Sequence, residues 1–224
     1  MKSTTRPVKK KKTGLAGISP TYWLIGIVAV MVALMLIVLV GLPAAATNTA
    51  KANGNSLGDA NAPVTMEVYA DFQCPICGQF DRGTLKQIED KYVKAGKVRI
   101  VFNHFAFIGD ESTRAAEASE CANAQGKFWE FSDTLFNNQA GENQGAFSDA
   151  NLEKFAQQVG LDMTQYKTCM DQNTYLGKVQ ASSQAAQQRG VDSTPTLFIN
   201  GQMARGAISL ATFESASARM SAMN

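Results

Sequence analysis

Two cysteines separated by two residues, Cys74 and Cys77, form the most reactive pattern in this 224-residue chain. The β-rich segment 64–70 precedes them and apolar residues at helical spacing follow, which predicts a strand-to-helix junction. Cys74 would cap that helix, and Pro75 would take its first position, where a missing N–H costs nothing. Free N–H groups and the dipole at a helix start stabilise a thiolate. The pattern therefore predicts thiol–disulfide exchange, with Cys74 as an exposed nucleophile and Cys77 as a partly buried resolving thiol, separated by the active-site dipeptide Pro75-Ile76.

Other roles for two closely spaced cysteines remain open. A structural zinc site needs further ligands, but the chain has one histidine, His104, and no second pair of this spacing. Attachment of a c-type haem needs a histidine after the second cysteine, where this chain has Gly78. A static short disulfide is the third alternative. The exchange chemistry predicts neither a metal nor a cofactor.

The elements that must position the pair alternate between strand and helix, which predicts one α/β domain over residues 61–224. Asn200-Gly201 is a dipeptide typical of a tight hairpin turn. The expected order is a strand (64–70), a helix (75–95), a strand (97–105), a mostly helical stretch (109–189), a hairpin (196–205) and a closing helix (208–220).

The N-terminal part predicts export. Residues 1–21 form a basic tail that contains six of the 21 basic residues and no acidic one, and an uninterrupted apolar run follows over residues 24–42. About 20 apolar residues cross a bilayer, and basic residues before the span keep the N-terminus in the cytoplasm. We therefore expect a single-pass anchor at 22–46 and a flexible linker at 47–60, with the catalytic domain outside the cell membrane. The alternative is a secreted domain whose signal peptide is cleaved near residue 46.

The charge balance argues against nucleic acid as a partner. All 19 acidic residues follow residue 58, so the exported part is mildly acidic and lacks the basic surface that binds phosphates.

Cys121 and Cys169 lie in the predicted helical stretch. In an oxidising compartment we expect them to form a structural disulfide. Closing so long a loop is worth about 4 kcal/mol in the chain-entropy treatment. Two free buried cysteines, or a second redox relay, are the alternatives. His104, which follows the second predicted strand, is expected to be a hydrogen-bonded strand-end residue and not a catalytic base.

Three segments, in this order, resemble the DsbA-like thiol:disulfide oxidoreductases: 69–77 (YADFQCPIC), 117–130 (EASECANAQGKFWE) and 190–201 (GVDSTPTLFING). The resemblance spans about residues 60–222 and implies a thioredoxin fold with a helical domain inserted before the hairpin. It also implies a cis Thr194-Pro195 bond beside the cysteine pair, which adds Thr194 and Pro195 to the catalytic residues. The partners it implies are reduced or misoxidised exported proteins and a membrane redox protein that recycles the dithiol.

The chain departs from this family at Val68, where many relatives place a buried carboxylate that moves protons. Glu67 and Asp71 are the nearby candidates for a proton relay, although either could be an ordinary strand-end acid. The direction of exchange also remains open. An oxidase is the first hypothesis, a reductase or isomerase (for cytochrome maturation or thiol repair) the second, and a non-catalytic assembly module with static cysteines the third.

Overall fold

The computed structural model of this chain describes residue 31 and residues 52–221. The expected anchor at 22–46 therefore lies outside the described residues, apart from Met31. Among the residues that are described, no helix combines the length and apolar character needed to cross a membrane.

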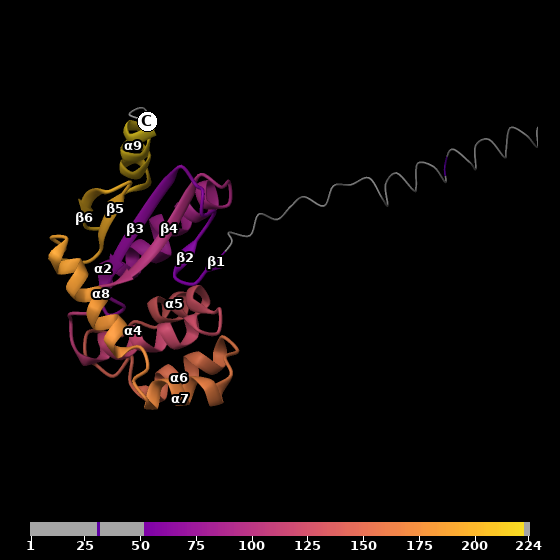
Figure 1. Cartoon of the computed structure of the whole chain (residues 1–224), viewed down its shortest axis with the longest axis vertical. Helices are drawn as coiled ribbons and strands as arrows, with labels where there is room; N and C mark the ends of the chain where they lie inside the picture. The colour runs from indigo at the N-terminus through magenta and orange to yellow at the C-terminus, as the bar shows by residue number, and fades with distance from the viewer. Residues whose placement is uncertain (1–30, 32–51, 222–224) are drawn as a thin grey trace, which may run out of the picture. The chain divides into compact units, whose positions relative to one another are not determined.

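The strands between residues 52 and 221 form one six-stranded sheet in the order β1-β2-β4-β3-β5-β6 (Figure 1). Strands β3 and β4 run parallel, with Val64 opposite Val98 and Ala70 opposite His104, whereas β5 runs antiparallel beside β3. A parallel pair requires a crossover, which the helical run after β3 supplies. The strands are β1 (Ala52–Asn53), β2 (Ser56–Leu57), β3 (Val64–Ala70), β4 (Val98–His104), β5 (Thr196–Ile199) and β6 (Gln202–Arg205).

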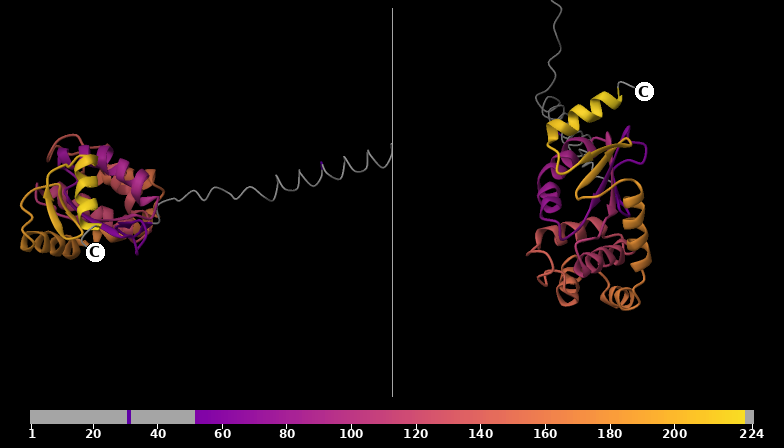
Figure 2. Two further views of the ribbon diagram at one scale, coloured as in Figure 1. Left: turned by 90° about the horizontal axis from the view of Figure 1, so that it is seen from above. Right: turned by 90° about the vertical axis from the view of Figure 1, so that its left-hand side faces the viewer.

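The helices fall into three groups. The crossover consists of α2 (Pro75–Phe80), the π-helical η1 (Asp81–Leu85), α3 (Lys86–Ile88) and the π-helical η2 (Glu89–Val93). The insertion between β4 and β5 contains α4 (Asp110–Asn123), α5 (Phe128–Asn137), α6 (Asp149–Gln158), α7 (Met163–Asp171) and α8 (Leu176–Gln188), and α9 (Leu210–Ser221) closes the chain. Figures 1 and 2 show α4–α7 gathered at one end of the sheet and α9 at the other, while α8 runs alongside.

The two faces of β3 are covered by different helices because neighbouring side chains of a strand point to opposite sides. Met66 and Val68 belong to the main core, together with residues of the crossover such as Ile88. Tyr69 faces the other way and joins a smaller cluster with Phe198 and with Ala186 of α8. The sheet is thus covered on both sides at β3, although Thr65 and Glu67 interrupt its apolar residues and are only partly buried.

One expectation is wrong. The small polar residues at 52–57 were predicted as part of a flexible linker, but they form the β1–β2 hairpin, and β2 pairs with β4. Leu57 is buried in the core, and the side chain of Asn55 donates a hydrogen bond to the carbonyl of Phe102 at 2.7 Å. These contacts join residues far apart in the sequence, so local composition does not predict them.

The remaining elements lie within a few residues of their predicted positions. A parallel β–α–β unit followed by an antiparallel hairpin and a final helix is the thioredoxin fold, and here a helical insertion interrupts it between β4 and β5.

Candidate active site

Cys74 and Cys77 are free thiols at the start of α2, in the first turn of the helix. Cys74 is the N-cap residue, with an extended backbone (φ −65°, ψ 118°), and Pro75 follows it at the first helical position. The Cys77 N–H donates to Sγ of Cys74 at 3.4 Å. The helix N-terminus therefore directs a donor at the first sulfur, as its N-cap position predicts.

The exposure of Cys74 differs from the expectation. It is only 7% exposed, compared with 1% for Cys77, so the prediction of an exposed nucleophile is wrong. Its sulfur lies under the loop before β5, 3.5 Å from the carbonyl oxygen of Thr194. Pro75 and Ile76 are the exposed residues of the motif.

The environment ionises the two thiols differently. A hydrogen bond from the Cys77 side chain lowers the pKa of Cys74 to about 6 despite the opposing effect of burial, and the side chain of Thr194 and the backbone N–H groups of Cys77 and Ile76 lower it further. Burial, followed by the interaction with Cys74, raises the pKa of Cys77 well above its ordinary value. At neutral pH the pair is therefore a thiolate at Cys74 and a thiol at Cys77.

The second segment of the site is the loop that leads into β5. The Thr194–Pro195 peptide bond is cis, and Pro195 is buried. The Gly206 N–H donates to the Pro195 carbonyl at 2.8 Å, which ties this loop to the end of β6. The structure thus brings Cys74, Cys77 and Thr194 together from segments about 120 residues apart.

Asp71 is buried, and the hydrogen bonds that its side chain accepts fix the loop before Cys74. One carboxylate oxygen accepts from Ser112 Oγ at 2.6 Å and from the Gln73 N–H at 2.8 Å. The other accepts from the N–H groups of Phe107 and Ile108 at 2.9 and 3.1 Å. A carboxylate with both oxygens engaged in this way holds the loop against the segment after β4.

Glu67 lies on the face of β3 that α8 covers. It forms an ion pair with Arg189 and accepts a hydrogen bond from the Tyr69 hydroxyl at 3.3 Å. The side-chain hydrogen bonds of Glu67 and Asp71 do not include either cysteine, although the backbone carbonyl of Asp71 accepts the Cys74 N–H at 3.1 Å. Proton relay by Glu67 or Asp71 stays a prediction that their hydrogen bonds do not support.

The sequence gives no indication of the polar side chains from the insertion that reach the active-site loop. Gln139, which follows α5, donates through Nε2 to the carbonyls of Phe72 and Cys74 at 2.7 and 2.9 Å. The Asn143 N–H donates to Gln73 Oε1 at 2.6 Å. These partners lie 65 to 70 residues apart. The only local sign is Gln73 itself, a polar residue between an apolar strand and the cysteines.

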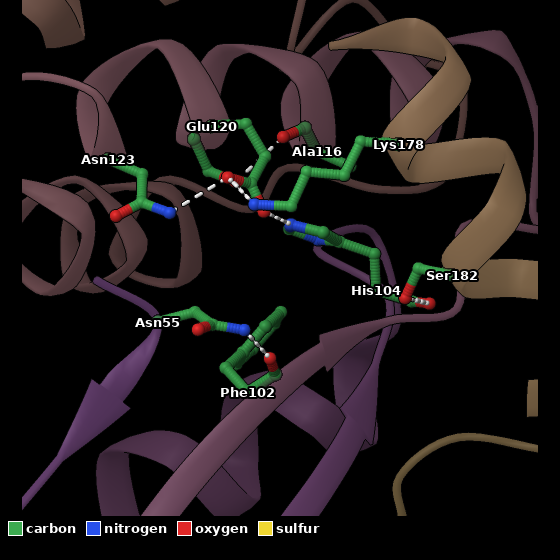
Figure 3. A network of polar contacts seen from close by, with 9 residues as sticks. Asn55, Phe102, His104, Ala116, Glu120, Asn123, Lys178 and Ser182 are labelled. Carbon is green, nitrogen blue, oxygen red and sulfur yellow. Dashed lines mark hydrogen bonds and ion pairs between the residues drawn. The ribbon is translucent and has the colours of Figure 1, made fainter. Parts of the chain in front are cut away.

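His104 ends β4 and belongs to a buried charged network (Figure 3). Its Nε2 lies 3.1 Å from Glu120 Oε1, and Oε2 of the same carboxylate accepts from Lys178 Nζ at 2.6 Å and from Asn123 Nδ2 at 2.8 Å. Burial alone would raise the pKa of Glu120, but His104, Lys178 and Asn123 together lower it to about 2. The network joins β4 to α4 and α8. His104 is therefore a strand-end residue, as expected, although its Nδ1 has no hydrogen-bond partner within the described residues.

Cys121 of α4 and Cys169 of α7 form a disulfide, with an S–S distance of 1.98 Å and a Cα–Cα distance of 6.0 Å. It links two helices of the insertion and is separate from the thiols of α2. The aromatic residues that follow Cys121, which are Phe128, Trp129, Phe131 and Phe136, are buried. Phe72 also belongs to the core, where its ring stacks on Phe102.

The fold and the paired thiols define a redox protein of the thioredoxin class, and comparison with known proteins narrows the class. The family model described as Thioredoxin matches residues 50–216. A probable disulfide bond formation protein D of Bacillus cereus is 31% identical over 153 residues, which cover 66% of this chain and 71% of that protein. The solved structure of oxidised BdbD from Bacillus subtilis superposes with a TM-score of 0.70 at 25% identity, over 75% of this chain and 92% of that one.

The chain therefore belongs to the DsbA-like thiol:disulfide oxidoreductases of the thioredoxin family. It also resembles part of the Na(+)/H(+) antiporter NhaA 3 of Salinispora tropica, with 32% identity over 151 residues that cover 66% of this chain and 22% of the antiporter.

Proposed function

We propose that this protein is an exported, membrane-tethered protein-disulfide oxidoreductase that oxidises the thiols of other exported proteins. The observation that carries the proposal is the placement of two free thiols in one helical turn, with Cys74 at the N-cap accepting the Cys77 N–H at 3.4 Å, which gives the two sulfurs opposite pKa shifts. A permanent structural disulfide does not require a difference between the pKa values of its two cysteines, whereas thiol–disulfide exchange needs one sulfur that is a stable thiolate.

The reaction starts from the oxidised pair. A substrate thiolate attacks Sγ of Cys74, the Cys74–Cys77 bond breaks, and Cys77 leaves and takes up a proton. A second substrate thiolate then attacks the substrate sulfur of the mixed disulfide and expels Cys74 as a thiolate. The substrate loses two electrons and gains a disulfide, while the protein gains two electrons and becomes a dithiol. The low pKa of Cys74 makes it a good leaving group in the second step, which favours oxidation of the substrate.

A membrane redox partner would then accept the electrons and restore the disulfide. The apolar run at residues 24–42 and its basic flank support a tether that keeps both proteins at one membrane surface. The likeness to part of an antiporter is consistent with a membrane setting. A reductase or isomerase would use the same residues with a reduced resting state.

Trapping the mixed disulfide tests the proposal. The Cys77→Ser variant should accumulate a covalent complex with a substrate variant that has a single cysteine under mild oxidation, because neither Cys77 nor a second substrate thiol can resolve it. The Cys74→Ser variant should accumulate none. The oxidised wild-type protein should convert the reduced parent substrate, which has two cysteines, to its disulfide in stoichiometric amount. Full activity of Cys74→Ser would refute the mechanism, and a wild-type protein that only reduces disulfides would favour the reductase.

A further inference from the structure

A single side chain of the insertion bridges two carbonyls of the active-site loop. The Nε2 group of Gln139 donates to the carbonyl of Phe72 at 2.7 Å and to that of Cys74 at 2.9 Å. The Cys74 carbonyl also accepts the N–H of Gly78 at 3.2 Å, which is among the first hydrogen bonds of α2. Gln139 thus holds the peptide group between Cys74 and Pro75, at which α2 starts.

Gly78 shows how closely this side chain fits. Its backbone is helical and needs no glycine, and glycine in a helix costs about 1 kcal/mol relative to alanine. A Cβ atom at this position would overlap Oε1 of Gln139 and would lie 2.8 Å from Nη1 of Arg82. The absence of a side chain at residue 78 therefore leaves the space that Gln139 occupies.

We infer that Gln139 is a positioning residue for thiol–disulfide exchange, because it holds the Cys74 peptide in the orientation that directs the Cys77 N–H at the reactive sulfur. The inference rests on the proposed function and assigns a role in it to the helical insertion. Through Gln139, a domain outside the thioredoxin core sets the reactivity of the cysteine pair.

The physical effect follows from the geometry. The Cys77 N–H lies 3.4 Å from Sγ of Cys74, so a small rotation of the Cys74 peptide weakens the contact. Without Gln139, the Cys74 carbonyl keeps only the hydrogen bond from the Gly78 N–H, so its peptide group is held less firmly in this orientation. The thiolate then loses stabilisation, and the reduced protein becomes less favourable relative to the disulfide.

The test uses three variants. Gln139→Met keeps the length of the side chain and removes the donor. Gly78→Ala displaces Gln139 without changing it, and the double variant combines both. Gln144→Met, in the same loop, is the control, because Gln144 is exposed and donates to the nearby Glu142 carbonyl. The measurements are the pKa of Cys74 by thiolate absorbance, the equilibrium constant with glutathione, and the urea unfolding midpoint.

We expect Gln139→Met to raise the pKa of Cys74 and to shift the glutathione equilibrium toward the protein disulfide by about fivefold, the ordinary size of one lost hydrogen bond. Gly78→Ala should raise the Cys74 pKa and shift the glutathione equilibrium in the same direction, and the double variant should add little to either single variant. The control should match the wild type.

Two outcomes would overturn the inference while leaving the proposed function intact. In the first, Gln139→Met lowers the unfolding midpoint but leaves the Cys74 pKa and the glutathione constant unchanged, which would make the residue merely structural. In the second, the effects of Gly78→Ala and Gln139→Met are additive, so that they act separately. A wild-type pair that does not exchange with glutathione at all would instead contradict the proposed function.

Discussion

The lowered pKa of Cys74 makes a quantitative prediction about the pH dependence of the reduced protein. A pKa of about 6 places about ten thiolates for every thiol at pH 7. This ionisation favours the reduced protein at pH 7 by about 1.4 kcal/mol, which corresponds to about 30 mV in a two-electron couple. The environment of Cys74 thus makes the protein a moderately stronger oxidant than an unperturbed pair would be.

The sign follows from the direction of the shift. The folded pKa lies below that of an unfolded cysteine, so the folded, reduced protein gains stability as the pH rises from about 6 to about 9, and this gain is lost as the pH falls through 6. Below pH 6 the reduction takes up two protons, and the potential should change by about 59 mV per pH unit; above pH 6 it takes up one, and the slope should fall to about 30 mV.

Thiolate absorbance of the reduced protein, titrated from pH 4 to pH 10, measures this directly. We expect one transition near pH 6 that disappears in the Cys74→Ser variant, and no second transition up to about pH 9, since the pKa of Cys77 is raised. Equilibration with glutathione at several pH values gives the slopes. A transition near pH 8 to 9, or a constant slope through pH 6, would refute the argument that the Cys77 thiol and the N–H groups of the helix start stabilise the thiolate.

Three further predictions concern other parts of the molecule. Glu120→Gln should lower the free energy of unfolding at pH 7 by about 3 kcal/mol, and it should remove the part of wild-type stability that is lost as the pH falls from about 4.5 to about 2. Urea unfolding measures this free energy, and an effect no larger than that of Glu130→Gln, at an exposed residue, would contradict the prediction. Replacing both Cys121 and Cys169 by Ala should cost up to about 4 kcal/mol of stability and leave the glutathione equilibrium of the active pair unchanged, so a shifted equilibrium would assign that disulfide a redox role. Ile76 is 44% exposed beside the buried Cys74, so Ile76→Ser should raise KM for an unfolded protein substrate about fivefold without changing the reaction with glutathione. Equal effects on both substrates would refute a direct contact between Ile76 and the protein substrate.

The chemistry of the pair could be predicted because its signals are local. The cysteine spacing, the β-rich run before it and Pro75 after it all lie within a few residues and agree on a helix start. The Asn200-Gly201 turn is local in the same sense, and both residues have positive φ values of 44° and 83°, as a tight hairpin turn requires.

The rest of the site could not be predicted because its partners are distant in the sequence. Gln139 meets the Cys74 carbonyl across 65 residues, and Lys178 meets Glu120 across 58. The spacing of apolar residues along the chain does not predict such pairs, since each polar residue alone resembles an ordinary surface residue. The β1–β2 hairpin was mistaken for a linker for the same reason: its two-residue strands are stable only because β4 provides the neighbouring edge.

The order of reactivity in the pair follows from position within one helical turn and not from exposure. Both sulfurs are nearly inaccessible, and burial raises the pKa of both. Cys74, as N-cap, receives the Cys77 thiol and backbone N–H groups that the helix leaves unpaired, so hydrogen bonding outweighs burial. Cys77 is that donor, and the same hydrogen bond raises its own pKa further. This hydrogen bond therefore adds to the difference that burial creates at Cys77, and any change that breaks it should bring the two pKa values toward each other even if both sulfurs stay buried.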